Sequence, residues 1–263
     1  AIFTKASTTG RLSYELWKAA VKRLDEEKVT SQPTRNKSVD IIIPVHNGYS
    51  NFQRCVDSVL RHTLPPYRAI VVNDASTDPD LLRYLEVLQT TNNVVVLHNS
   101  ENKGYVRAAN RALRYGEDDV ILLNSDTVVT KGWFEKLRRC AYSHTKIGTV
   151  SPLTNNDTIC SIPNFCENNP IPEGFDIDSL AELVEESSSK SYPPIITSPG
   201  FCVYIKRQVM NEIGIFDEDF APAYEEENDF CIRAFKAGYF AVLDDATFIH
   251  HRGEASYSEK ASR

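Results

Sequence analysis

The chain has 263 residues, of which 41% are hydrophobic and 25% are charged, as is ordinary for a folded globular protein. This length is enough for one large α/β domain or two small ones. The formal net charge of −7 argues against nucleic acid as a partner, because domains that bind nucleic acid usually present a basic face. No apolar run approaches the roughly 18 residues that a membrane-spanning helix needs, and no signal peptide is visible.

Six cysteines show neither a CxxC pair nor the spacing of a zinc finger: Cys55, Cys140, Cys160, Cys166, Cys202 and Cys231. Several lie in apolar stretches, as buried free thiols usually do. We therefore expect a reducing, cytoplasmic setting, while a bond between Cys160 and Cys166 in a loop stays open. The chain begins at Ala1 rather than Met and ends in a polar run, which suggests a fragment of a longer chain with additional domains.

The first predicted element is an amphipathic helix over residues 11–28, with Leu12, Leu16, Ala20 and Leu24 on one face. It carries charges of both signs, so we expect it to dock on protein rather than on a membrane surface, with peripheral membrane contact as the alternative. The polar stretch TSQPTRNKS then predicts a linker, and we place a boundary at residue 37.

Four apolar runs predict strands at 39–43, 68–73, 93–98 and 119–124. A helical pattern follows each strand, beginning near Ser50, Asp78, Tyr105 and Lys131. Strands that alternate with helices predict parallel pairing with right-handed crossovers. Residues 38–150 therefore read as the nucleotide-binding half of an α/β domain.

The pattern changes in the second half, residues 151–263. Residues 151–197 are rich in Pro, Asn and Ser, with an acidic patch over 176–186, and we interpret them as an irregular loop that faces an acceptor. A strand and a helix are predicted over 201–214, a helix that ends at Gly238 over 225–238, and one or two strands over 239–251.

Small polar residues follow every strand of the first half, in the segments PVHNG (44–48), NDASTD (73–78), NSENKG (99–104) and NSD (124–126). The carboxyl ends of parallel strands meet at one edge of a sheet, where α/β proteins bind ligands. Asp126 follows a strand buried on both faces, and a carboxylate there can hold a divalent cation that bridges a diphosphate. The plainer alternative is that each of these residues only makes a turn or caps a helix.

The chain resembles a family 2 glycosyltransferase of the GT-A fold over about residues 38 to 253. Five motifs carry the resemblance, in order and at sensible spacing: VDIIIPVHNG, VVNDASTD, ENKGYVRAANRAL, LLNSDT and YEEENDFCIRAFKAG. It implies a Rossmann-like, mostly parallel sheet flanked by helices, with an acceptor-side half at the C-terminus. It also implies an enzyme that moves a sugar from a nucleotide-sugar donor, UDP or dTDP most of all, with inversion at the anomeric carbon.

The resemblance assigns the nucleotide to the first two strand ends. Pro44, Val45 and Asn47 match the loop that lines the base and ribose, and Asp74 matches the acid that hydrogen-bonds the nucleobase. His46 departs from the more usual Tyr, which leaves stacking on the base in doubt.

The next two strand ends match the segments around the diphosphate. Lys103, Gly104 and Arg107 match the segment that closes over the nucleotide, where a cation meets the diphosphate. Asn124-Ser125-Asp126 matches the acidic metal-binding motif, with Asn in place of its first acid. That position tends to face the ribose, which an amide can still hydrogen-bond, and Asp126 keeps the metal-ligand position.

Inversion needs a general base that accepts the proton of the acceptor hydroxyl. In the family the base is the second acid of a pair, followed two residues later by another acid. This pattern selects Glu227, with Glu226 and Asp229 as supports or acceptor contacts. The alternative is that these acids only favour a helix N-terminus.

A second metal ligand is expected near the end of the chain, where FIHHR offers His250 and His251, and His250 matches the family better. One carboxylate and one imidazole suit Mn²⁺ or Mg²⁺. The remaining histidines have no such support: His46, His62, His98 and His144.

The expected partners are a nucleotide sugar and a saccharide or glycolipid acceptor, in polysaccharide or glycolipid synthesis at the inner face of a membrane. The alternative is a catalytically silent GT-A module that binds or scaffolds within a larger protein. A nucleotidyltransferase would usually open with a Gly-rich basic loop, and a Rossmann dehydrogenase with GxGxxG, and neither pattern follows a strand here.

Overall fold

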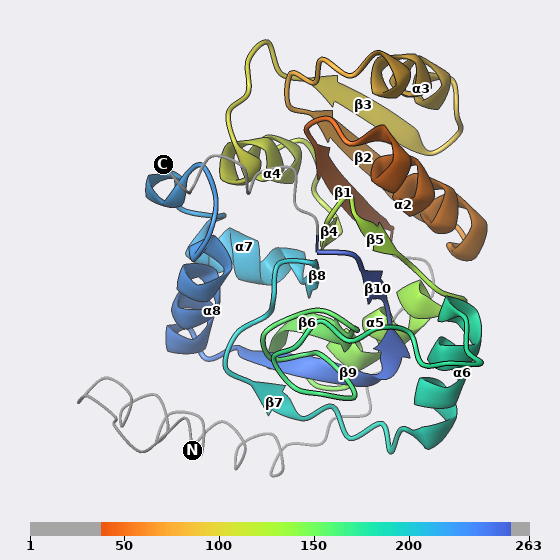
Figure 1. The fold of residues 1–263 in the computed structure, drawn as a ribbon. Helices are drawn as coiled ribbons and strands as arrows, with labels where there is room; N and C mark the ends of the chain where they lie inside the picture. The colour runs from red at the N-terminus through yellow and green to blue at the C-terminus, as the bar shows by residue number, and fades with distance from the viewer. Residues whose placement is uncertain (1–37, 254–263) are drawn as a thin grey trace.

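The computed structural model describes residues 38–253, so the predicted N-terminal helix and linker lie outside the described residues. Its central sheet has eight strands in the order β3-β2-β1-β4-β8-β6-β9-β7, flanked by helices (Figure 1). The predicted α/β class with a mostly parallel sheet is confirmed.

The first half of the chain builds the parallel part of the sheet. It contains β1 (Val39–Val45), β2 (Arg68–Asn73), β3 (Val94–His98) and β4 (Asp119–Leu123), which pair in parallel. The helices between and after them are α2 (Tyr49–His62), α3 (Pro79–Gln89), α4 (Tyr105–Leu113) and α5 (Trp133–Tyr142). All four predicted strands and the helices that follow them are therefore present.

Alternation along the strands separates two apolar cores. Ile41 and Ile43 of β1 pack in the core that α2, α3 and α5 cover, whereas Ile42 packs in the core on the opposite face. That second core lies under α4 and two later helices, α7 (Arg207–Ile213) and α8 (Glu226–Lys236). Strands buried on both faces explain why β1 and β4 read as continuous apolar runs.

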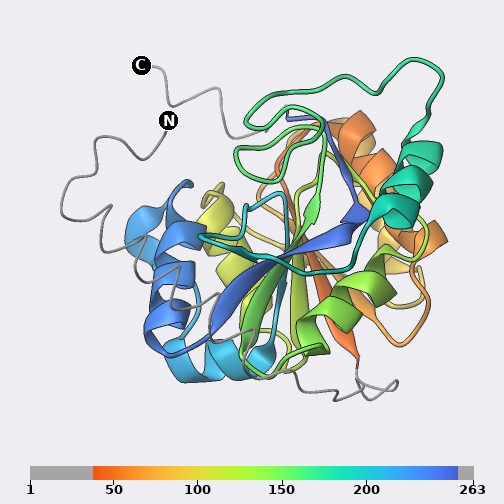
Figure 2. The ribbon, with the colours of Figure 1, turned by 90° about the horizontal axis from the view of Figure 1, so that it is seen from below.

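The second half extends the sheet with β8 (Cys202–Ile205), β6 (Ile147–Leu153), β9 (Phe240–Phe248) and β7 (Pro194–Ile195). β8 is antiparallel to both β4 and β6, whereas β6 and β9 are parallel. β6 crosses the predicted division at residue 150, so one continuous sheet joins the two halves (Figure 2). A separate antiparallel pair joins β5 (Thr127–Val128) to β10 (His250–His251).

The stretch 151–197 is less irregular than its composition predicted. It contains the end of β6, the short β7 and α6 (Ile177–Ser187), which forms where only an acidic patch was expected. A capping box explains this helix, because the Asp176 side chain accepts from the Ser179 backbone while Ser179 reaches back to the Asp176 backbone. The interpretation of 151–197 as a wholly irregular loop was wrong.

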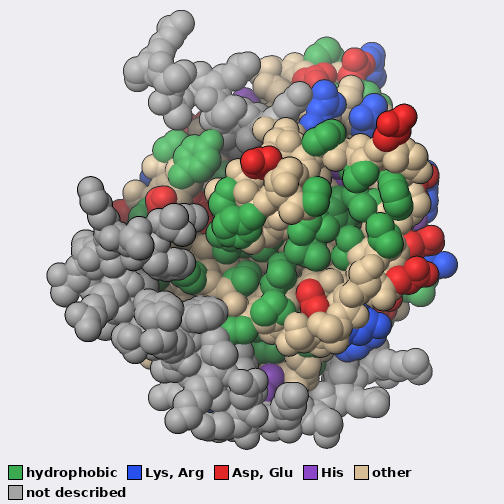
Figure 3. Space-filling model, turned by 60° about the horizontal axis from the view of Figure 1, so that its bottom comes forward, with side chains coloured by type: hydrophobic (Ala, Val, Ile, Leu, Met, Phe, Trp, Pro, Cys, Tyr) green, Lys and Arg blue, Asp and Glu red, His purple; other side chains and the backbone are tan. Residues whose placement is uncertain are grey.

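All six cysteines, each in the described part of the chain, are free thiols, and Cys160 and Cys166 are not bonded to each other. No helix among the described residues is long and apolar enough to cross a membrane. One face of the molecule carries a broad area of hydrophobic side chains, with acidic and basic side chains gathered mainly toward one edge (Figure 3). That face is apolar rather than basic.

Candidate active site

The carboxyl ends of β1 and β4 open into a cavity of about 270 Å³. Pro44 after Ile43 and the segment Asn124–Asp126 form one side of it. The opposite side comes from Gly200 and Phe201 before β8, from Glu226 and Glu227 at the start of α8, and from His251 on β10. Segments more than a hundred residues apart in the chain thus contribute to one site.

Asp126 and His251 face each other across the pair of β5 and β10. The Nε2 atom of His251 lies 3.4 Å from Oδ1 of Asp126, and their side chains are only 15% and 6% exposed. Burial alone would raise the pKa of Asp126, but the adjacent His251 lowers it below its ordinary value. Burial likewise opposes the charged form of His251, yet the Asp126 carboxylate raises the pKa of that ring.

His250, the residue that sequence reasoning preferred as a metal ligand, does not line this cavity. Burial, followed by the charge of His251, lowers the pKa of His250. Neighbouring residues in a strand point to opposite faces, so only one of two adjacent histidines can face Asp126. The structure places His251 there and His250 away from the cavity, so the preference for His250 is not supported by its position, and metal binding by either histidine stays a prediction.

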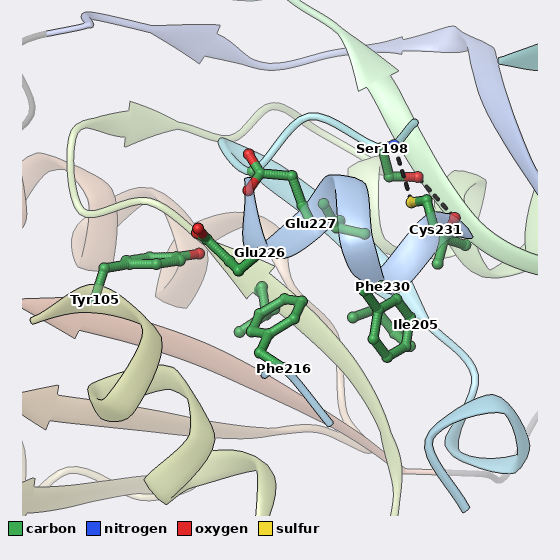
Figure 4. Close-up of a pocket in the computed structure, with 12 residues that line it drawn as sticks. Tyr105, Ser198, Ile205, Phe216, Glu226, Glu227, Phe230 and Cys231 are labelled. Atoms are coloured by element: carbon green, nitrogen blue, oxygen red, sulfur yellow. Dashed lines mark hydrogen bonds between the residues drawn. The ribbon is translucent and has the colours of Figure 1, made fainter. Parts of the chain in front are cut away.

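Glu226 and Glu227 begin α8 and line both this cavity and an adjacent, largely apolar pocket, which Figure 4 shows. Glu226 is 3% exposed and has apolar neighbours below it, among them Phe216 and Phe230. Burial first and the charge of Glu227 second raise the pKa of Glu226 far above its ordinary value. Burial also raises the pKa of Glu227, but contacts with Glu226 and with the Gly200 backbone lower it in part.

The ring of Tyr105, at the first position of α4, extends toward Glu226 (Figure 4). On the other side, a Cβ atom at Gly200 would lie 3.0 Å from Oε1 of Glu227. Gly200 is therefore needed for the close approach of the chain to this carboxylate. The two acids are held between α4 and the segment before β8.

Asp74 is completely buried and holds the loop 99–104 in place. Its carboxylate accepts hydrogen bonds from the Asn99 side chain at 2.6 Å and from the backbone N–H groups of Lys103 at 3.0 Å and Gly104 at 2.9 Å. The expected hydrogen bond to a nucleobase stays a prediction. In the structure, the oxygens of Asp74 bind the protein itself.

The residues that follow β1 have distinct environments. Pro44 lines the cavity, whereas the Val45 side chain is fully buried in the core and cannot contact a nucleotide. His46 Nδ1 lies 2.8 Å from the carbonyl oxygen of Asp74. The Asn47 side chain accepts hydrogen bonds from the backbone N–H groups of Thr77 and Asp78, so it shapes the loop after β2.

Three further predicted residues have structural partners. The side chains of Lys103 and Arg107 approach Glu101 and Glu218, at 3.9 Å and 3.4 Å. Gly104 has a φ of +82°, and a Cβ atom there would lie 2.7 Å from Pro222, so only glycine fits.

Asp229 binds Arg233 at 2.7 Å on the next turn of α8. It does not line the cavity, so the prediction that Asp229 contacts the acceptor is not supported by its position.

Sequence reasoning missed several residues that line the cavity: Tyr105, Asp157, Gly200, Phe201, Ala223, Tyr224 and Gly253. Tyr224 is 57% exposed and adopts a left-handed φ of 81°, which is uncommon for a bulky residue. Tyr224 and Tyr105 lie within or beside quoted motifs, and that proximity was the available signal. The loop residues Asp157 and Gly200 had no such signal.

Residues 40–157 match a family model described as Glycosyl transferase family 2. The chain carries a family 2 glycosyltransferase domain. The uncharacterized glycosyltransferase YwdF of Bacillus subtilis is 27% identical over 226 residues, which cover 85% of this chain and 77% of the relative. The putative teichuronic acid biosynthesis glycosyltransferase TuaG of the same organism is 34% identical over 116 residues, 41% of this chain and 45% of the relative.

The fold of the glycosyltransferase also matches solved structures. A structure of GalNAc-T7 with UDP, GalNAc and Mn²⁺ aligns with a TM-score of 0.66 at 17% identity. The alignment covers 83% of this chain but 44% of that one. At this identity the likeness establishes the fold, and it confirms the predicted GT-A architecture.

Proposed function

We propose that this glycosyltransferase transfers a sugar from a UDP- or dTDP-sugar to an acceptor hydroxyl, with inversion at the anomeric carbon. The observation that carries the proposal is the shared cavity: a buried carboxylate–histidine pair lies on one side and two adjacent glutamates lie on the other. The first suits a metal–diphosphate group, and the second suits proton transfer from an acceptor.

Glu227 is the proposed general base. Burial raises the pKa of both acids; contact with Glu227 raises that of Glu226 further, whereas contact with Glu226 offsets part of the rise for Glu227. A proton held on Glu226 and shared toward Glu227 has this effect, since it leaves Glu227 as the ionised partner. Neighbouring acids that respond differently to their mutual contact are suited to different roles, one protonated and one basic.

The residues at the other side of the cavity fit a divalent cation. Oδ2 of Asp126 and Nε2 of His251 are buried without hydrogen-bond partners. An oxygen donor beside an imidazole nitrogen suits Mn²⁺ or Mg²⁺. The described residues contain no group of three or more His, Cys, Asp or Glu side chains placed to hold a metal. We therefore propose that Asp126 and His251 would be the protein ligands of a divalent cation beside the donor diphosphate.

In the proposed reaction, the acceptor oxygen forms a bond to the anomeric carbon while the bond from that carbon to the diphosphate oxygen breaks. Glu227 takes the hydroxyl proton, and the nucleoside diphosphate leaves with the electron pair. When bound, the divalent metal acts as a Lewis acid toward the charge on the leaving group. Glu226 is buried beside Phe216 and Phe230, which limits the access of water to this side of the acid pair.

The acceptor is proposed to be a saccharide or glycolipid in polysaccharide synthesis, at the cytoplasmic face of a membrane. The name of TuaG, a putative teichuronic acid biosynthesis enzyme, supports this class of product. Pro44, Asn124 and Ser125 line the cavity beside Asp126 and are the proposed contacts of the nucleotide and ribose.

A thermal-shift panel tests the donor site. The protein is mixed with UDP, dTDP, GDP or CDP, with and without Mn²⁺, and compared with Asp126→Ala. A ligand at 100 times its dissociation constant adds about 2.7 kcal/mol of stability. We expect a Mn²⁺-dependent shift with UDP or dTDP that the variant loses. A wild-type protein that shifts with none of the nucleotides contradicts the proposal and favours a silent module.

A further inference from the structure

The loop of residues 154–169, here called the asparagine loop, packs against β10 and encloses His251. It contains five asparagines: Asn155, Asn156, Asn164, Asn168 and Asn169. Composition predicted only an irregular loop that faces an acceptor, with no role at the metal site. Its hydrogen bonds with β10 give it one.

The Asn155 side chain makes hydrogen bonds with both the backbone N–H and the backbone carbonyl of His251. Its Nδ2 donates to the carbonyl oxygen of His251 at 3.1 Å, and its Oδ1 accepts from the His251 N–H at 2.8 Å. Asn155 is only 5% exposed, so these bonds form away from water. These two hydrogen bonds fix the position and orientation of the His251 backbone, and therefore of the Cα atom that carries the imidazole.

The ring of His251 is fixed separately. Its Nδ1 lies 2.8 Å from the carbonyl oxygen of Asn156, and a carbonyl can only accept, so Nδ1 carries a proton. With the proton of the neutral ring held at Nδ1, Nε2 is the nitrogen free to bind a metal, and it lies 3.4 Å from Oδ1 of Asp126. Phe201 stacks on the ring face at 5.4 Å with an interplanar angle of 19°. The tautomer, the plane and the direction of the imidazole are all determined.

A third asparagine supports the first. The backbone N–H and Nδ2 of Asn169 both donate to the carbonyl oxygen of Asn155, at 2.9 Å and 3.1 Å. Nδ2 also reaches the carbonyl of Asn164 at 2.9 Å, and Asn169 is 3% exposed. Asn169 therefore connects the two ends of the asparagine loop and stabilises the backbone of Asn155, which binds His251.

We infer that the asparagine loop is the positioning element of the metal site, in which Asn155 orients the backbone of His251 and the Asn156 carbonyl sets its metal-binding tautomer. The inference rests on the proposed function, because it assigns His251 to the metal. Partners that orient a ligating histidine in this way contribute strongly to metal affinity, and their loss typically costs about 10–100-fold.

The test is a titration of the full chain with Mn²⁺ at saturating UDP, in which electron paramagnetic resonance measures free Mn²⁺. We expect Asn155→Ala to weaken Mn²⁺ binding by about 10–100-fold while UDP affinity without metal stays unchanged. Turnover of the UDP-sugar should return as Mn²⁺ is raised, which a general loss of folding would not allow. Asn168→Ala, at an exposed position of the same loop, is the matched control and should bind Mn²⁺ as the wild type does.

A measurement on the wild type does not depend on the folding of a variant. ¹⁵N NMR of the His251 ring with Mg²⁺ and UDP should show a protonated Nδ1 and an unprotonated Nε2. Unchanged Mn²⁺ affinity in folded Asn155→Ala, or an unprotonated Nδ1, overturns the inference while the proposed function stands. A wild-type chain that binds UDP without any effect of Mn²⁺ overturns the metal site itself.

Discussion

Replacing Glu226 by Gln should stabilise the protein, and more so at high pH. Glu226 is 3% exposed, and burial followed by the charge of Glu227 raises its pKa from 4.5 to about 8. Between these two pH values the folded protein holds a proton that the unfolded chain has released. Stability therefore falls as the pH rises from about 4.5 through about 8, because the unfolded state binds fewer protons there.

The size of the effect follows from the same shift. At about 1.4 kcal/mol for each pH unit, a rise from 4.5 to about 8 corresponds to at most about 5 kcal/mol of lost stability above pH 8. The proton is shared with Glu227, and a buried amide has its own desolvation cost of about 1–3 kcal/mol. We therefore expect Glu226→Gln to gain on the order of 2 kcal/mol at pH 8 and close to nothing at pH 4.5.

Urea denaturation at pH 5 and pH 8 measures this difference for the wild type and Glu226→Gln. Glu225→Gln is the matched control, since Glu225 precedes the pair and is exposed. Its unfolding free energy should follow that of the wild type at both pH values. A Glu226→Gln protein that is no more stable at pH 8 than the wild type, or that keeps the same dependence on pH, refutes the account of the buried acid pair.

Three further predictions address the site. Glu227→Gln should lower kcat by about 10²–10⁴-fold with UDP affinity retained, measured by UDP release and calorimetry, and full activity would exclude Glu227 as the base. His251→Ala should abolish the effect of Mn²⁺ on UDP binding while the neighbouring His250→Ala retains it, and the reverse result would return the metal to His250. Asp74→Ala should cost at least about 2 kcal/mol in urea unfolding and increase hydrogen exchange in the loop 99–104, because three donors lose a buried acceptor; unchanged exchange there would contradict its anchoring role.

The parallel part of the fold was predictable because its strands are buried on both faces. The run Val120–Leu123 has no polar interruption, and strands of this kind occur almost only in α/β sheets. β6 was missed because IGTVSPL contains Gly148 and Pro152, which obscure the apolar pattern. α6 was missed because its composition reads as an acidic loop, although its capping box is visible in the sequence.

The residue types of the site were predictable from the sequence, but the strand register that selects one of the two histidines was not. The sequence pointed to an acid at Asp126, an acid pair at the start of a helix and a histidine near the end of the chain. Which histidine faces the acid depends on the pairing of His251 with Thr127 across β5 and β10. A shift of one residue would exchange the two faces, and local sequence does not determine that register.

Side-chain orientation also decided which of the other predicted site residues line the cavity. Val45 follows the nucleotide-lining pattern in sequence but faces the core, while Asp229 turns to Arg233 rather than to the cavity. Tertiary packing decides such orientations, and motif spacing cannot report them. The asparagine loop illustrates the reverse case, since its role depends on contacts with residues about 96 positions away in the chain.

The most direct test of the account is a crystal structure of the protein with UDP and Mn²⁺, with the metal located by its anomalous scattering. We expect a single strong peak in the cavity, bonded to Asp126 and to Nε2 of His251 and next to the diphosphate, with Glu227 free on the opposite side. A peak held by His250, or a bound UDP whose diphosphate lies away from Asp126 with no metal beside it, would contradict the proposed metal-dependent transfer.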